Sequence, residues 1–416
     1  MLNCDHAISL FGESLAAGAK ADQLLHPIKL DLVTSFPPSK GDLNEYGFHL
    51  ARTLQGDERV SLTILADEPS TQSESAGFDV RRCWRFNSIS NLVRVPRAIL
   101  KTRPDVVWFN IGFSTFGREP LAAFLGIMIP ALTRLLGFYT HITLHTVFER
   151  IDFQDAGIRW PGLYRAAGRI ATRLVLLAND VTVLLPSFRA ELLKNYRRQS
   201  ERVHFRPHGI FTDLPHAAPL EQEREGGVVL AFGYWGTYKR LDLLFEAMDK
   251  VREKFPNTTL VVAGKNHPST PGYIEAMRER CINKNVRFLG YVAEPDLVTL
   301  FRSATVLALP YSSAAGVSGV VHQGCQYGLP MVAADIAEIR ESAEAEGIAI
   351  NFYQPGDAQM LAGQLIQLLE STELRRSISK HNLLIAQNMQ FPKIVDGYLQ
   401  LFQERVAGSR KQAKST

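Results

Sequence analysis

The fold is decided by one stretch, Val228-Val229-Leu230-Ala231-Phe232-Gly233-Tyr234-Trp235-Gly236, which leads into Lys239-Arg240-Leu241-Asp242-Leu243-Leu244. An apolar run without alternation is typical of a strand covered on both faces of a parallel sheet, and the segment from Gly233 to Gly236 is predicted to turn the chain. From Leu241 onward, apolar residues recur at helical spacing, so Lys239 and Arg240 are predicted to lie at a helix start. Free N–H groups and the helix dipole attract anions there, which makes this turn a candidate phosphate site. The alternative for Lys239 is a solvated lysine.

The same unit recurs along the rest of this half of the chain. Four further strand-like segments, separated by helical ones, lie at residues 259–264, 286–290, 305–310 and 329–335. Strands that alternate with helices predict βαβ crossovers and a parallel sheet. Ligands of such sheets bind beyond the carboxyl ends of the strands, so the turns after the strands are the candidate binding loops.

The first half of the chain predicts a second domain of the same kind. A strand at 29–36 is followed by the loop Pro37-Pro38-Ser39-Lys40-Gly41-Asp42 and by a helix that Asn44 or Asp42 is expected to cap. More strands are predicted at residues 61–66, 105–109, 141–145 and 180–184. The predicted fold class is α/β, with two Rossmann-like, doubly wound domains that face a central cleft.

The length of 416 residues also favours two domains over one core. We expect an N-terminal extension at residues 1–27, a first domain at 28–212, a polar linker at 213–227 and a second domain at 228–390. Residues 391–416 are expected to form a helix that crosses back onto the first domain and ends in a basic tail.

The composition is that of a globular protein, with 46% hydrophobic and 21% charged residues. A net charge of +4 is too small to imply nucleic acid as a partner. The four cysteines are scattered, which predicts free thiols, a reducing cytoplasmic location and no metal site. The N-terminus lacks the pattern of a signal peptide.

One region favours contact with an anionic membrane surface. Such contact would place the protein on the inner face of the plasma membrane. The apolar run at residues 120–139 is interrupted by Pro130 and Arg134 and is too short to span a bilayer. Basic and apolar side chains then alternate, namely Arg150, Arg159, Trp160, Leu163, Tyr164, Arg165, Arg169, Ile170 and Arg173. The alternative is a solvated helix face.

Several motifs, taken in order, resemble those of a known family. They are Pro37-Pro38-Ser39-Lys40-Gly41, Thr143-Leu144-His145-Thr146, Arg206-Pro207-His208-Gly209-Ile210, Tyr238-Lys239-Arg240-Leu241-Asp242, Phe288-Leu289-Gly290-Tyr291-Val292 and Tyr327-Gly328-Leu329-Pro330-Met331-Val332-Ala333-Ala334-Asp335. In order and spacing the chain resembles the retaining glycosyltransferases of family 4, which have the GT-B architecture. The resemblance runs from residue 28 to about residue 402.

The resemblance implies a donor site in the second domain. Lys239 would bind the donor diphosphate beside Gly233, and the backbone around Val292 would meet the base. The family's arginine after the strand glycine is missing, because Tyr234 and Gly236 stand there, and Arg240 is the candidate replacement. The family's Glu-x7-Glu pair aligns with Ala315 and Gln323, so both carboxylates are absent.

Other residues could compensate for this loss. The amide of Gln323 could bind a ribose hydroxyl, and the helix start Gly316-Val317-Ser318-Gly319 could hold phosphate or sugar oxygens. His145 ends a first-domain strand and is a catalytic candidate together with Lys239, although a histidine satisfied by backbone is an equal alternative. Gly41 is a further candidate at the cleft.

Two functions remain open. The first is a retaining hexosyltransferase that uses a UDP- or GDP-sugar, needs no metal or other cofactor, and extends a lipid-linked or polysaccharide acceptor in cell-envelope or exopolysaccharide synthesis. The alternative is a catalytically degenerate GT-B protein that binds nucleotide-sugar or glycan as a partner subunit. This alternative remains open because Ala315 and Gln323 stand where the family has its two glutamates.

Overall fold

A computed structural model describes residues 26–39, 43–69, 77–148, 161–196, 200–211, 227–267, 270–281, 285–314 and 316–415. The chain divides into two compact units. Of the described residues, one unit contains those from 26 to 207 together with the segment from Phe391 onward, and the other contains His208–Gln390. We call them the first and second domains and describe each by itself.

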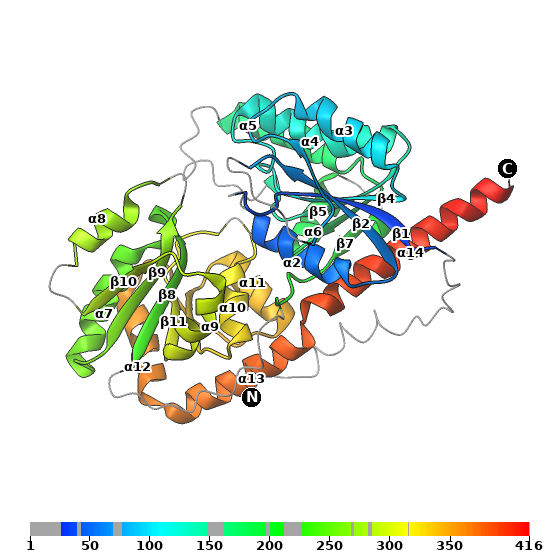
Figure 1. Ribbon diagram of the computed structural model, residues 1–416. Coiled ribbons are helices and arrows are strands. Elements are labelled where there is room, and N and C mark those ends of the chain that lie inside the picture. Colours follow the sequence, from blue (N-terminus) through cyan, green and yellow to red (C-terminus); the bar gives the residue numbers. More distant parts are fainter. Residues whose placement is uncertain are drawn as a thin grey trace. The chain divides into compact units, whose positions relative to one another are not determined.

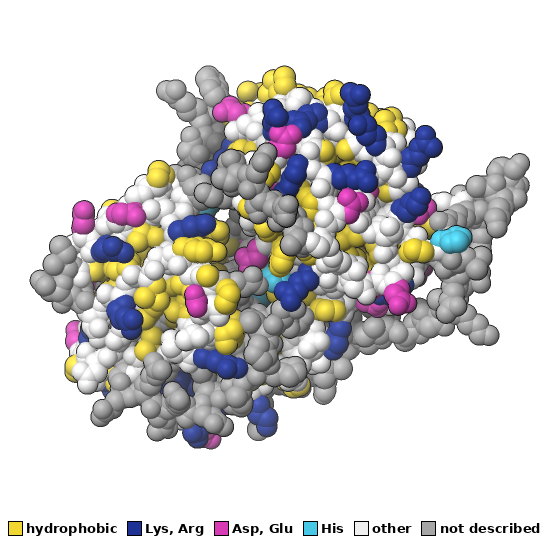
Figure 2. Space-filling view, viewed as in Figure 1, with side chains coloured by type: hydrophobic (Ala, Val, Ile, Leu, Met, Phe, Trp, Pro, Cys, Tyr) yellow, Lys and Arg dark blue, Asp and Glu magenta, His cyan; other side chains and the backbone are white. Residues whose placement is uncertain are grey.

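The first domain is built on a seven-stranded parallel sheet in the order β3-β2-β1-β4-β5-β6-β7. The strands are β1 (Ile28–Thr34), β2 (Val60–Asp67), β3 (Val80–Trp84), β4 (Val106–Ile111), β5 (Tyr139–Leu144), β6 (Asp180–Val183) and β7 (Val203–Phe205). The helices are α2 (Asn44–Gln55), α3 (Asn91–Thr102), α4 (Pro120–Leu135), α5 (Pro161–Val175), α6 (Pro186–Tyr196) and α14 (Phe391–Ser415). Helices α3, α4 and α5 lie side by side over one face of the sheet, and α2 and α14 cover the other (Figure 1). Hydrophobic and basic side chains gather over α3 to α5 in the upper part of Figure 2.

Helix α14 belongs to the first domain although it follows the second domain in the chain. The rings of Tyr398 and Phe402 lie 4.5 and 5.2 Å from that of Trp108 on β4. Further along the helix, Arg405 pairs with the buried Asp180 at 3.0 Å. The helix therefore completes the core of the first sheet.

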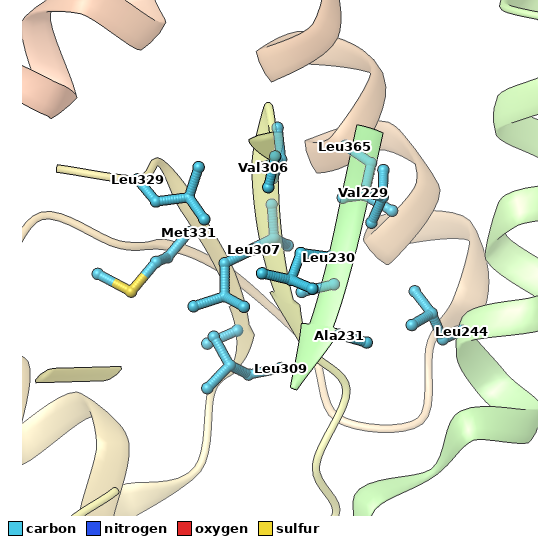
Figure 3. Close-up of a cluster of buried hydrophobic side chains, with 14 of the residues drawn as sticks. Val229, Leu230, Ala231, Leu244, Val306, Leu307, Leu309, Leu329, Met331 and Leu365 are labelled. Carbon is cyan, nitrogen blue, oxygen red and sulfur yellow. The ribbon is translucent and has the colours of Figure 1, made fainter. Parts of the chain in front are cut away.

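The second domain has a six-stranded parallel sheet in the order β10-β9-β8-β11-β12-β13. Its strands are β8 (Val228–Trp235), β9 (Thr259–Asn266), β10 (Val286–Gly290), β11 (Val306–Leu309), β12 (Met331–Ala334) and β13 (Asn351–Tyr353). Its helices are the short η3 (Thr237–Lys239), α7 (Leu241–Lys254), α8 (Tyr273–Glu279), α9 (Glu294–Ser303), α10 (Gly319–Gln326), α11 (Ala337–Glu346), α12 (Ala358–Glu370) and α13 (Thr372–Asn388). The central strands bury aliphatic side chains on both faces, as the consecutive residues Val229 and Leu230 of β8 show (Figure 3).

The strand order reverses at one place in each sheet. It does so between β1 and β4 in the first domain and between β8 and β11 in the second. The loops that leave these neighbouring strands diverge to opposite faces, and the crevice between them is where doubly wound sheets bind ligands. The loop after β8 carries Lys239, and the loop after β11 leads to α10.

Two local predictions are wrong. Strand β8 does not end at Gly233, because Gly233 pairs with Gly264 of β9 and the strand continues to Trp235. Two glycines are needed there, since a Cβ on Gly264 would lie 1.8 Å from the Gly233 carbonyl oxygen. Helix α2 is preceded by Leu43 and has no side-chain cap, because Asn44 is its first residue and donates its amide to the Ser39 carbonyl instead.

Three strands, β3, β7 and β13, were not predicted. They are short, and β3 contains two arginines, so neither length nor an apolar run marks them. Cys83, Cys281 and Cys325 are free thiols. Among the helices that the structure describes, none combines the length and apolarity needed to cross a bilayer.

Candidate functional site

Lys239 ends the short helix η3 and is buried, with 7% of its surface exposed. Its ammonium lies 4.7 Å from the ring centroid of Tyr311 and 5.7 Å from that of Trp235. Burial lowers the pKa of Lys239 to about 7, and in the described part of the chain no carboxylate pairs with it. Lys239 is therefore not the solvated lysine of the alternative interpretation. An amine buried without a counter-ion is poised to accept an anionic ligand.

The ammonium lies close to the start of α10. A Cβ on Gly233 would sit 2.6 Å from Lys239 Nζ and 3.4 Å from a methyl group of Val320 in the first turn of that helix. Gly233 has φ +132°, so an L side chain is disfavoured there on two grounds. The absent side chain leaves room between Lys239 and α10.

The loop before α10 provides free backbone donors. Ser318 is the N-cap, and its side chain makes no capping hydrogen bond. Gly319 starts the helix and is exposed, while Gly316 and Val317 are half-buried. The N–H group of Val321 donates to the Ser318 carbonyl at 3.1 Å, so the N–H groups of Gly319 and Val320 are the first-turn candidates for binding phosphate or sugar oxygens. Ala315 lies outside the described residues.

A buried ion pair between His322 and Glu346 anchors this loop. His322 on α10 donates Nδ1–H to the Ser318 carbonyl at 2.9 Å and Nε2–H to Glu346 on α11 at 2.8 Å. Because both partners only accept, the imidazole must carry both protons. Burial by itself lowers the pKa of His322, but the charge and hydrogen bond of Glu346, with the Ser318 carbonyl, outweigh it and raise the pKa. His208 lies 4.5 Å from the His322 ring.

The structure gives less direct support for the remaining predicted donor-site residues. Arg240 adopts a left-handed conformation, and its guanidinium pairs with Asp242 at 2.9 Å, so its charge is already matched. Val292 is half-buried against the core of its own domain. Gln323 is half-buried on α10, one residue after His322. Gly41 lies outside the described residues.

His145 follows β5 in the first domain, next to Asn110 on β4. Thr34 donates its hydroxyl proton to the Ser35 carbonyl at 3.1 Å and must accept from Asn110 Nδ2 at 3.0 Å. The oxygen of Asn110 therefore faces His145 Nε2, 2.6 Å away, and that nitrogen carries the proton. Burial lowers the pKa of His145 to about 3. The result is a neutral ring with the lone pair on Nδ1, bonded to a side chain instead of to backbone.

Several of these partners were not identified from the sequence. Tyr311 and Trp235 enclose Lys239, Asn110 orients His145, and Glu346 balances His322. Only Trp235 lies near its partner in the chain, so no local pattern could have marked the others. In the described ranges, no group of three His, Cys, Asp or Glu side chains could hold a metal ion.

Comparison with known proteins gives a family match within the second domain. Residues 226–371 match the family model described as glycosyl transferases group 1. This segment is a group 1 glycosyltransferase domain. It contains Lys239, Gly233 and α10, the groups that converge at the strand-order reversal.

Curated relatives of the chain include two enzymes that are named for inositol compounds. The D-inositol 3-phosphate glycosyltransferase of Salinispora arenicola is 29% identical over 219 residues, 48% of this chain and 47% of that protein. The phosphatidyl-myo-inositol mannosyltransferase of Mycolicibacterium smegmatis is 29% identical over 174 residues, 41% of this chain and 43% of that protein. The matched region thus spans less than half the length of these relatives.

Solved structures similar over nearly the whole chain establish the architecture. HepE of Anabaena in complex with UDP and glucose has a TM-score of 0.62 at 15% identity, covering 92% of this chain and 99% of that one. Sucrose-phosphate synthase of Thermosynechococcus elongatus has a TM-score of 0.71 at 15% identity, covering 92% and 100%. WaaG, a lipopolysaccharide glycosyltransferase, has a TM-score of 0.64 at 16% identity, covering 90% and 99%. The predicted GT-B fold and the resemblance to family 4 glycosyltransferases are confirmed.

Proposed function

We propose that the protein is a retaining hexosyltransferase that takes its sugar from a UDP- or GDP-linked donor. The observation that carries this proposal is the Lys239 ammonium, which is buried without a carboxylate partner among the described residues and lies beside the free start of α10. A diphosphate placed there would meet one positive charge and a set of N–H donors.

The proposed chemistry follows from where negative charge develops. The bond between the anomeric carbon and the diphosphate oxygen breaks, and its electron pair stays on the diphosphate. The acceptor hydroxyl oxygen bonds to the same face of that carbon, and its proton passes to the departing phosphate oxygen. Lys239 and the α10 amides neutralise the leaving group, which is often the largest catalytic contribution. Gln323 is the proposed partner of the ribose, and His145 Nδ1 is proposed to accept a hydrogen bond from a substrate hydroxyl.

The proposed acceptor is a lipid-linked or glycan hydroxyl in cell-envelope synthesis. Relatives named for phosphatidyl-myo-inositol and a structural neighbour named for lipopolysaccharide biosynthesis support this class. We propose that the protein works in the cytoplasm, at the inner face of the plasma membrane, without a metal or other cofactor.

Calorimetric titration with UDP, GDP and ADP, followed by incubation with the matching nucleotide sugars, tests this proposal. Binding of one nucleotide together with slow release of sugar would support a transferase. Binding without sugar release, with or without added acceptor lipid, would favour the degenerate binding protein that the loss of two motif glutamates keeps open. No binding of any nucleotide would contradict the donor site.

Lys239→Ala is the variant that examines the site directly. We expect its nucleotide affinity to fall at least a hundredfold, because a charge-assisted contact to a diphosphate contributes about 3 kcal/mol. Lys254→Ala is the matched control, since Lys254 is exposed at the far end of α7. Equal affinities for the two variants would overturn the assignment of Lys239.

A further inference from the structure

The segment after β11 brings a second polar side chain to Lys239. Tyr311 lies two residues beyond Leu309, which ends the strand and is buried in the core of the second domain (Figure 3). The backbone N–H and the hydroxyl of Ser312 both donate to the Tyr238 carbonyl, at 2.7 and 3.1 Å. These two hydrogen bonds fasten the segment to η3, which also carries Lys239.

Tyr311 has a buried hydroxyl that lacks a partner in the free protein. Only 4% of the residue is exposed, and within the described ranges the hydroxyl makes no hydrogen bond of normal geometry. Burial raises the pKa of Tyr311, an effect that the nearby Ser318 side chain offsets only in part, so the phenol keeps its proton at physiological pH. A buried O–H without an acceptor costs free energy, which a ligand oxygen can restore.

This hydroxyl belongs to the surroundings of the candidate diphosphate site. The Tyr311 ring centroid lies 4.7 Å from Lys239 Nζ, and Ser318, whose side chain acts on the hydroxyl, is the N-cap of α10. The space that Gly233 leaves lies between Lys239 and the first turn of the same helix. An ammonium, a phenol hydroxyl and backbone N–H groups therefore meet at one place. All are donors, and in the described part of the chain no carboxylate pairs with Lys239 or Tyr311.

We propose that the Tyr311 hydroxyl donates a hydrogen bond to the donor diphosphate, beside Lys239 and the start of α10. This inference rests on the proposed function and adds a binding residue to it. A phosphate oxygen that enters the space beside Gly233 would give the hydroxyl its acceptor and would neutralise Lys239. Because Tyr234 and Gly236 stand where the family has an arginine, the site lacks a cation, and the O–H of Tyr311 takes over part of that role.

Tyr311→Phe separates the hydroxyl from the ring. The variant keeps an aromatic face toward Lys239 and loses only the donor. We therefore expect its affinity for UDP, GDP or ADP, whichever the parent binds, and for inorganic pyrophosphate to fall about tenfold or more. Because the hydroxyl has no acceptor in the free protein, the thermal unfolding midpoint without ligand should be unchanged or higher. A hydroxyl that serves the structure alone would give a lower midpoint and an unchanged affinity.

The pH dependence distinguishes a direct contact from an effect transmitted through Lys239. Tyr311 stays protonated over the neutral range, so the ratio of the parent affinity to the Tyr311→Phe affinity should be the same at about pH 6 and about pH 8. A ratio that changes between these pH values would mean that the substitution acts on the charge of Lys239, and it would overturn the proposal.

Tyr327→Phe is the matched control. Tyr327 is also 4% exposed and follows α10 at the end opposite to Ser318, so its loss of a hydroxyl should leave nucleotide affinity unchanged. An equal loss of affinity in this control would overturn the proposal. Equal affinities of the parent and Tyr311→Phe for a nucleotide that the parent binds would overturn this inference alone and leave the donor site in place. A parent that binds no nucleotide and no pyrophosphate would overturn both.

Discussion

At the residue scale, burial perturbs two candidate catalytic groups in different ways. Lys239 has aromatic faces around it and a pKa of about 7, so it is charged in only part of the molecules at neutral pH. His145 has a pKa of about 3 and is neutral throughout the physiological range. The first group can gain a proton when an anion binds, and the second can only accept a hydrogen bond at Nδ1.

The pKa of Lys239 predicts how donor affinity depends on pH. A diphosphate prefers the protonated amine, so affinity should be constant below about pH 7 and should fall up to tenfold per pH unit above it, until the raised pKa of the complex is reached. Titration with a nucleotide sugar measures this, because its diphosphate does not titrate in that range. Lys239→Met should bind weakly and show no such slope. A slope that persists in that variant would assign the proton to another group.

The tautomer of His145 can be tested through Asn110. In Asn110→Asp a carboxylate faces Nε2, so we expect the pKa of His145 to rise from about 3 by at least two pH units. Histidine ring NMR measures this, with the signal assigned by its loss in His145→Gln. Asn110→Ser, which offers no charge, should leave the ring neutral at pH 6. An unchanged pKa in the aspartate variant would show that Asn110 does not face the ring.

At the element scale, the start of α10 depends on a pair buried between α10 and α11. Ser318 is held by His322, and His322 by Glu346, whose carboxylate also accepts from Ser342 at 3.2 Å. The loop that would bind the donor is therefore positioned by His322 directly and by Glu346 through His322. No side chain caps the N–H groups at the start of α10, because His322 holds Ser318 by its carbonyl oxygen.

Glu346→Gln should lower the free energy of unfolding by about 2 kcal/mol at pH 6, because it leaves a buried imidazolium without its counter-charge. The folded-state pKa of His322 is raised, so the pair's contribution is complete below the unfolded value of about 6.5 and is lost as pH rises through the folded value. The variant should therefore differ least from the parent at high pH.

Glu344→Gln provides the control for this prediction. Glu344 lies on the same helix and its side chain is 67% exposed, so we expect a change within about 0.5 kcal/mol at any pH. Urea unfolding at several pH values measures both variants. A pH-independent loss in Glu346→Gln would mean that His322 is neutral in the folded state.

At the scale of the whole molecule, the two domains have separate cores, and the chain ends in the first of them. Phe402 is fully buried, with its ring 5.2 Å from those of Trp108 and His141. A residue near the C-terminus therefore stabilises the domain formed by the N-terminal half.

Phe402→Ala should lower only one of two calorimetric transitions, by an amount equivalent to about 3–5 kcal/mol. The transition that a bound nucleotide raises identifies the second domain, and it should be the one left unchanged. Glu404→Ala, an exposed neighbour, should shift neither. A loss confined to the nucleotide-sensitive transition would contradict the placement of α14.

Much of the fold was predictable because burial leaves a local pattern. The apolar runs of β8 and β11 and the periodicity of α7 identified the parallel sheet of the second domain. Short edge strands such as β3 leave no such pattern, and the continuation of β8 through Gly233 depends on Gly264 in the adjacent strand.

The sequence by itself determined the two doubly wound domains, the turn that carries Lys239 and the helix start at Ser318, since each follows from residues within one turn or one strand. The tertiary structure alone decided that Lys239 is buried under Tyr311, that Asn110 orients His145, and that Glu346 charges His322. These partners lie 24 or more residues apart in the chain. Hydrophobic periodicity reports which side of an element is buried, whereas a contact between elements exists only once the strand order of the sheet has brought their ends together.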